Sequence, residues 1–124
     1  MPARHAAIKL ISAIDEFFID EGCHIKELSN TEEDAEVSIA HARVEPGVTT
    51  HWHRLVDTTE RYVIIDGEGR VEIGDLEPTA VGPGDAVIIP PMCRQRITNT
   101  GDGDLVFLAI CSPRFEPACY ESLE

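Results

Sequence analysis

Short apolar runs recur along the chain at intervals of about ten residues, with turn residues between them. This rhythm predicts strands rather than helices, because strands are short and are separated by glycine, proline and acidic turns. The segments that we expect to be strands are Val37–Val44, Arg61–Ile65, Arg70–Ile73, Ala86–Ile89, Gln95–Thr98 and Leu105–Ile110. So many short strands in 124 residues predict an all-β sandwich or barrel.

Four segments carry more specific expectations. Asp66-Gly67 separates two predicted strands, and this dipeptide favours a hairpin. The unbroken apolar run Leu105–Ile110 is typical of a strand buried on both faces. Residues Ile8–Phe18 fit a helix or a strand equally well. The last residues, 112–124, contain two prolines and are expected to wander over the surface.

Composition and charge exclude some classes of function for this chain. The chain is 43% hydrophobic, which suits one globular domain with its own core. Aspartate and glutamate total 23 against 10 for lysine and arginine, so the formal net charge is -13. Such a surface repels phosphate groups and anionic lipids, and we therefore expect no nucleic acid and no membrane as partners.

The lack of a recognisable targeting signal and the pattern of cysteines lead us to expect a cytoplasmic protein. No apolar run approaches the ~20 residues that a membrane helix needs. The segment after Met1 is too short and too charged for a signal peptide. The four cysteines, which are Cys23, Cys93, Cys111 and Cys119, stand at unrelated spacings without a C-x-x-C pair. We expect them to be reduced thiols rather than a structural zinc site.

A first set of spaced residues lies in the middle of the chain. Five residues separate Gly47 from His53, Leu55 follows two positions later, and further gaps of four and six residues lead to Glu60 and Gly67. This spacing resembles the first motif of the cupin superfamily, with leucine at the second histidine position. The pair His51-x-His53 also has the family's His-x-His form, but it lies two residues early, so we prefer the register without gaps.

A second set follows at the spacing of the family's second motif. Five residues separate Gly84 from Pro90, and Met92, Gln95 and Asn99 then stand where the family has glycine, histidine and asparagine. The departures are Met92 and Gln95. The resemblance implies a cupin double-stranded β-helix, or jelly-roll barrel, with little helix. It also implies one domain over 1–124, with N-terminal strands at 1–35, the barrel at 36–111 and a tail at 112–124, and it implies a homodimer.

The resemblance further implies a metal pocket. Cupins typically hold a divalent ion, such as zinc, iron, nickel or manganese, through three histidines and one glutamate. His51 shares a strand face with His53 and can replace the lost histidine. The implied ligands are His51, His53, Glu60 and Gln95, and the implied pocket-lining residues are Tyr62, Leu55, Arg43 and His41. The plainer alternatives are exposed or hydrogen-bonded histidines, an exposed charge for Glu60, a hydrogen-bond donor for Gln95, a packed tyrosine, and salt bridges for Arg43 and His41.

The function that follows is a metal-binding cupin acting on a small molecule, for example a dioxygenase or an isomerase. A non-catalytic small-molecule binding or sensing module is the alternative, favoured by the loss of two family histidines. A structural or storage barrel ranks last, because polar groups remain at the pocket positions. Fold alone does not choose between these chemistries.

Overall fold

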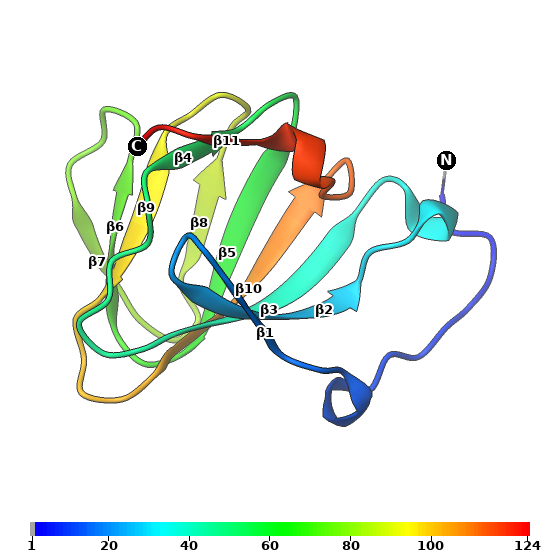
Figure 1. The fold of residues 1–124 in the computed structure, drawn as a ribbon, viewed down its shortest axis with the longest axis horizontal. Coiled ribbons are helices and arrows are strands. Elements are labelled where there is room, and N and C mark those ends of the chain that lie inside the picture. Colours follow the sequence, from blue (N-terminus) through cyan, green and yellow to red (C-terminus); the bar gives the residue numbers. More distant parts are fainter. Residues whose placement is uncertain (1) are drawn as a thin grey trace.

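Two antiparallel sheets face each other in the computed structural model, which describes residues 2–124 (Figure 1). One sheet has the order β1-β2-β3-β10-β5-β8, and the other has the order β11-β4-β9-β6-β7. The strands are β1 (Phe17–Ile19), β2 (Cys23–Ser29), β3 (Ser38–Val44), β4 (His53–Leu55), β5 (Thr59–Asp66), β6 (Gly69–Ile73), β7 (Thr79–Val81), β8 (Ala86–Ile89), β9 (Gln95–Asn99), β10 (Leu105–Ser112) and β11 (Tyr120–Ser122).

The all-β prediction is confirmed, and all six predicted strands are present. Helix is limited, within residues 2–124, to the 3-10 turns η1 (Ile11–Ala13), η2 (Glu32–Asp34) and η3 (Pro117–Cys119). No helix in this part of the chain is long and apolar enough to cross a membrane. The ambiguous N-terminal stretch divides into η1 and the strand β1, which pairs with β2 at one edge of the six-stranded sheet.

The hairpin predicted at Asp66-Gly67 is wrong. Strand β5 pairs with β10 and β8, whereas β6 pairs with β7 and β9, so the turn carries the chain from one sheet to the other. Gly67 has a φ of +86°, and a Cβ there would lie 2.5 Å from the carbonyl oxygen of Asp104. The glycine is therefore needed for backbone conformation and for close approach, although the turn does not pair its flanking strands.

The expectation that Leu105–Ile110 is buried on both faces is also wrong. Leu105 and Phe107 are almost fully buried on the inner face of β10, whereas Val106 and Leu108 are only half-buried. The reason is architectural. In a two-layer sandwich each sheet covers only the inner face of the other, even for a central strand such as β10 between β3 and β5.

The C-terminal residues do not wander over the surface. After η3 the chain forms β11, which pairs with β4 and places Tyr120 opposite Leu55 (Figure 1, red). The backbone N–H of Arg114 also donates to the carbonyl oxygen of Ala35 at 3.1 Å. The prolines therefore shape the path of the tail, and the tail adds an edge strand to the five-stranded sheet.

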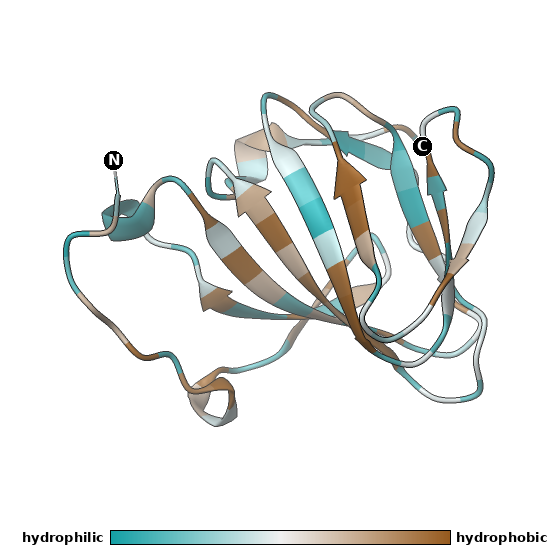
Figure 2. Cartoon of the chain, turned by 180° about the vertical axis from the view of Figure 1, so that it is seen from behind, coloured by the Kyte–Doolittle hydropathy of each residue, from teal (hydrophilic) through white to brown (hydrophobic). Residues whose placement is uncertain are grey.

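Apolar side chains of both sheets fill the space between them. Figure 2 shows brown, hydrophobic bands along the strands and mostly polar connections. The buried core comprises Cys23, Ala42, Val44, Tyr62, Ile64, Val71, Ile73, Val87, Ile89, Ile97, Leu105 and Phe107. These residues hold the two sheets together, and several of them also line a cavity that reaches toward β1, β2 and the C-terminal segment.

Candidate functional site

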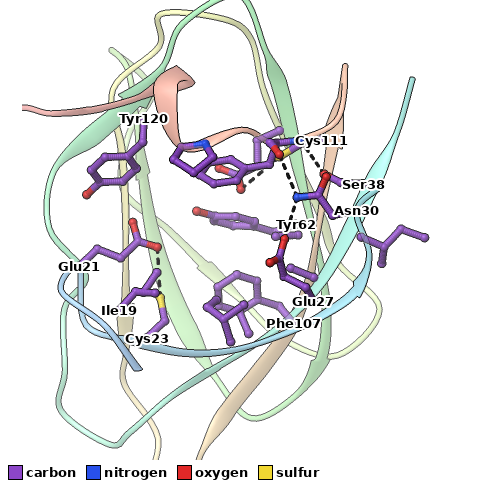
Figure 3. A pocket seen from close by; sticks show the side chains of 18 of the residues that line it. Ile19, Glu21, Cys23, Glu27, Asn30, Ser38, Tyr62, Phe107, Cys111 and Tyr120 are labelled. Atoms are coloured by element: carbon purple, nitrogen blue, oxygen red, sulfur yellow. Dashed lines mark hydrogen bonds between the residues drawn. The ribbon is translucent and has the colours of Figure 1, made fainter. Parts of the chain in front are cut away.

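A cavity of about 630 Å³ opens along the inner face of the six-stranded sheet (Figure 3). Its walls come from β1, β2, β3, β5 and β10, and residues 114–120 of the C-terminal segment cover one side. This volume is typical of a site for a small organic molecule. Most of the lining is apolar. The few polar groups in it are therefore the candidates for binding or reacting with a ligand.

Glu60 is the buried ionisable carboxyl group among these polar groups. It lies on β5 opposite Cys111 of β10, and only 9% of its surface is exposed. Its Oε2 accepts a weak hydrogen bond from Cys111 Sγ at 3.6 Å, and its Oε1 has no hydrogen-bond partner in the described chain. Burial raises the pKa of Glu60 to about 7, and the nearby Glu21 carboxylate adds to the rise, while Gln95 and Cys111 oppose it.

Tyr62 and Gln95 form a buried polar pair beside Glu60. The Tyr62 hydroxyl donates to Gln95 Oε1 at 2.5 Å, and Gln95 is fully buried. Gln95 Nε2 has no acceptor at hydrogen-bonding geometry among residues 2–124. Burial raises the pKa of Tyr62 well above its usual value, so this hydroxyl stays protonated and holds the amide in place.

A second carboxylate faces the cavity from the turn between β1 and β2. Glu21 Oε1 accepts from Cys23 Sγ at 3.4 Å, and Glu21 Oε2 lies 3.3 Å from His53 Nδ1. His53 Nδ1 is itself 2.9 Å from the carbonyl oxygen of His51, and its ring stacks on Tyr120 at 5.0 Å. Figure 3 shows Glu21 and Tyr120 on the same side of the cavity, with the Tyr62 ring at its centre.

The structure brings four of the predicted site residues close to one another. His53 pairs with Gln95 across β4 and β9, and Gln95 bonds to Tyr62, which follows Glu60 by two positions on β5. Of these four, Glu60 and Tyr62 line the cavity, while His53 and Gln95 lie behind its wall. This division follows from the sheets, because β4 and β9 belong to the sheet on the far side of the cavity.

The other predicted residues lie outside the cavity lining. His51 is exposed and Leu55 is buried behind the wall. Arg43 forms salt bridges with Glu16 at 2.7 Å and with Asp104 at 3.3 Å, as its plainer alternative expected. His41 is half-buried on the same strand.

Sequence reasoning missed three groups that shape the pocket, namely Glu21, Tyr120 and Cys111. Glu21 stands in the turn Asp20-Glu21-Gly22, and nothing in its spacing marks it, because it reaches the site through the pairing of β1 with β2. Tyr120 stands in the tail, which we expected on the surface. A signal for Cys111 existed, since it ends the apolar run of β10, but only the strand register places it opposite Glu60.

The described side chains are not gathered into the metal centre that the family resemblance implies. Across residues 2–124, no three histidine, cysteine, aspartate or glutamate side chains approach closely enough to hold one ion. Gln95 Oε1, the atom that would ligate a metal, is engaged by Tyr62, and its free atom is the donor nitrogen. The polar groups around Glu60 are therefore better suited to hydrogen bonding and proton transfer.

Comparison with known proteins places this geometry in context. Residues 40–111 match the family model of the cupin domain. Protein MJ1618 of Methanocaldococcus jannaschii, which is uncharacterized, is 31% identical over 90% of either chain. Glucose-6-phosphate isomerase of Thermococcus onnurineus is 25% identical over 89% of this chain and 71% of that enzyme. The structure of KdgF from Halomonas superposes with a TM-score of 0.81 at 17% identity, over 92% of this chain and 99% of that one.

Proposed function

Because this chain belongs to the cupin family, we propose that it is an acid–base enzyme that acts on a small organic molecule in the cavity between its sheets. One observation carries the proposal. The carboxyl group of Glu60 is buried, lines the cavity, and has one oxygen without a hydrogen-bond partner in the described chain. A buried acceptor of this kind costs free energy unless a bound molecule satisfies it.

The chemistry that suits Glu60 is proton transfer. A general acid or base works best when its pKa lies near the working pH, and the pKa of Glu60 is raised to about 7. As a carboxylate it takes a proton from a C–H bond beside a carbonyl group, and as the acid it returns that proton to a neighbouring atom. Return of the proton to a neighbouring carbon or oxygen is an isomerisation. Its delivery to a hydroxyl group on the next carbon, which then leaves as water, is an elimination. Similarity to a glucose-6-phosphate isomerase supports the isomerisation.

A non-catalytic binding or sensing module remains the second candidate. The observation that favours it is the replacement of two family histidines by Leu55 and Gln95, both of which are buried. A module of this kind would use the same cavity, and Glu60 would act only as a hydrogen-bond acceptor. The two functions differ in whether a carbon-bound hydrogen of the ligand exchanges with water.

The deciding experiment measures that exchange. The protein is incubated in D₂O with a panel of hydroxycarbonyl and aminocarbonyl compounds, and mass spectrometry follows deuterium uptake at carbon. We expect exchange of at least one compound by the wild type and a loss of about 100-fold or more in Glu60→Gln, as for removal of a general base. The control Glu68→Gln changes an exposed carboxylate and should exchange at the wild-type rate. Binding without exchange would instead support the binding module. Exchange that survives Glu60→Gln would show that Glu60 is not the base.

The metal set His51, His53, Glu60 and Gln95 stays a prediction, and nickel titration tests it. An amide oxygen is a weaker donor to nickel than imidazole, so Gln95→His should tighten nickel binding about tenfold or more, as measured by calorimetry. His5→Ala, which removes an exposed imidazole, is the control and should change nothing. Equal affinities for the wild type and Gln95→His, with binding lost in His51→Ala as completely as in His53→Ala, would show that His51-x-His53 is the family pair.

We also propose a cytoplasmic homodimer. The four cysteines are all free thiols, which suits a reducing compartment. Phe18 on the edge strand β1 is 58% exposed and Ile8, earlier in the chain, is 87% exposed, and such apolar surface favours a partner. Light scattering should give twice the mass of one chain at micromolar concentration. Phe18→Asp should shift the mass toward one chain, and a monomeric wild type would contradict the prediction.

A further inference from the structure

The charged groups that line the cavity are mostly acidic. Four carboxylates belong to the lining, namely those of Asp20, Glu21, Glu27 and Glu60, against a single guanidinium, that of Arg114. Arg114 is already engaged, because it donates to Asn30 Oδ1 at 3.0 Å and pairs with Glu116 at 3.1 Å. The cavity therefore presents a negative potential to any molecule that enters it.

Two of the carboxylates have buried oxygens with unmet hydrogen-bonding capacity. Glu60 Oε1 and Glu21 Oε2 have no hydrogen-bond partner within residues 2–124. The other oxygen of each accepts from a thiol, Cys111 or Cys23, and thiols are weak donors. The Gln95 amide beside Glu60 and the Tyr120 hydroxyl beside Glu21 are the further polar neighbours of these two carboxyl groups. His53 Nδ1 lies 3.3 Å from Glu21 Oε2, but it is directed at the His51 carbonyl oxygen. A ligand that brings N–H donors would satisfy both carboxylates.

Aromatic rings form much of the remaining wall. Tyr62 and Phe107 pack together with ring centroids 4.5 Å apart, and Figure 3 shows Tyr120 on the side of Glu21. The Tyr62 hydroxyl is committed to Gln95, so the ring offers its face rather than its O–H group. Aromatic faces attract organic cations and provide apolar contact for the body of a ligand.

We propose that this pocket selects an organic cation, a primary or substituted ammonium group carried on an apolar body, with the ammonium seated between Glu21 and Glu60. The inference rests on the proposed function in that it concerns the same cavity, and it names the class of molecule that the cavity takes. Anionic substrates are disfavoured, because the one guanidinium of the lining is already paired. The specificity thus differs from that of an enzyme for a sugar phosphate.

Three probes with the same aromatic body test the charge requirement directly. Benzylammonium, benzyl alcohol and benzoate are titrated into the wild type by calorimetry at pH 8 and low salt. We expect benzylammonium to bind at least tenfold more tightly than benzyl alcohol, and benzoate to bind more weakly than either. Raising the salt concentration should weaken the binding of benzylammonium and leave that of benzyl alcohol unchanged, because only the cation gains from the carboxylates.

A variant locates the effect. Glu21→Gln should weaken the binding of benzylammonium about tenfold and keep the affinity for benzyl alcohol within about twofold of the wild type. The exposed control Glu68→Gln should change neither affinity. The salt and probe comparisons use the wild type, so they test the preference for a cation even if Glu21→Gln does not fold. Absence of benzylammonium binding, or tighter binding of benzyl alcohol or benzoate, would overturn the inference.

The outcomes separate this inference from the proposed function. If benzyl alcohol or benzoate binds best, the cation preference fails while the acid–base role of Glu60 stands on its own exchange experiment. If benzylammonium binds best but carbon exchange is independent of Glu60, the acid–base role fails while the cation preference stands.

Discussion

Glu60→Gln should stabilise the fold by about 3 kcal/mol at pH 8, a gain large enough to detect by denaturant unfolding. The pKa of Glu60 is raised from 4.5 to about 7, first by burial and then by the Glu21 carboxylate. Each unit of pKa is worth ~1.4 kcal/mol. A neutral amide of the same shape avoids the cost of burying a charge beside a second carboxylate.

The pH dependence fixes the sign of the effect. Because the pKa is higher in the folded state, the folded protein binds a proton that the unfolded chain has lost between about pH 4.5 and pH 7. The stability that protonated Glu60 contributes is therefore present at low pH and is lost as the pH rises through 7. The advantage of Glu60→Gln should shrink by about 2 kcal/mol between pH 8 and pH 5.5.

The control for this measurement is Glu68→Gln, which neutralises an exposed carboxylate. It should stay within about 0.5 kcal/mol of the wild type at both pH values. A constant difference between Glu60→Gln and the wild type from pH 5.5 to pH 8 would show that Glu60 titrates normally, and it would remove the main support for its acid–base role.

The strands were predictable because each is short, apolar and bounded by turn residues, and the spaced glycines and prolines identified the family. The pairing of the strands was not predictable from local pattern. Asp66-Gly67 has the residues of a hairpin, but β5 is already paired on both edges by β10 and β8. Partner choice depends on contacts between distant segments, and a local dipeptide does not encode them.

The candidate site was likewise predictable only in part. Strand alternation correctly placed Glu60 and Tyr62 on one face, because residues two apart in a strand share a face. It said nothing about which sheet would border the cavity, and so it did not separate these two from His53 and Gln95 behind the wall. Glu21 and Tyr120 reach the pocket only after the first and last strands add to the sheet edges. Their roles depend on tertiary structure alone.

Asn99, the last residue of β9, makes the densest set of side-chain hydrogen bonds in the second motif. Only 1% of its surface is exposed. Its Nδ2 donates to the carbonyl oxygens of Val44 and Gly103, both at 2.8 Å, and its Oδ1 accepts from the backbone N–H of Gly101 at 2.9 Å. One amide thus satisfies three backbone groups and ties the end of β3 to the loop that leads into β10.

Asn99→Leu should therefore lower the free energy of unfolding by about 3 kcal/mol or more, since each buried polar group left unpaired costs about 1–3 kcal/mol. Leucine has the same branched arrangement of side-chain heavy atoms and leaves no cavity, so the loss measures the hydrogen bonds together with crowding by the larger methyl groups. Asn99→Asp should also destabilise at pH 8, because it keeps the acceptor for Gly101 but sets a carboxylate against two carbonyl oxygens. Thr100→Ala, at the exposed neighbouring position, should stay within about 0.5 kcal/mol of the wild type. Denaturant unfolding of the three variants provides the comparison, and a loss below 1 kcal/mol in Asn99→Leu would mean that water satisfies the three backbone groups as well as the amide does.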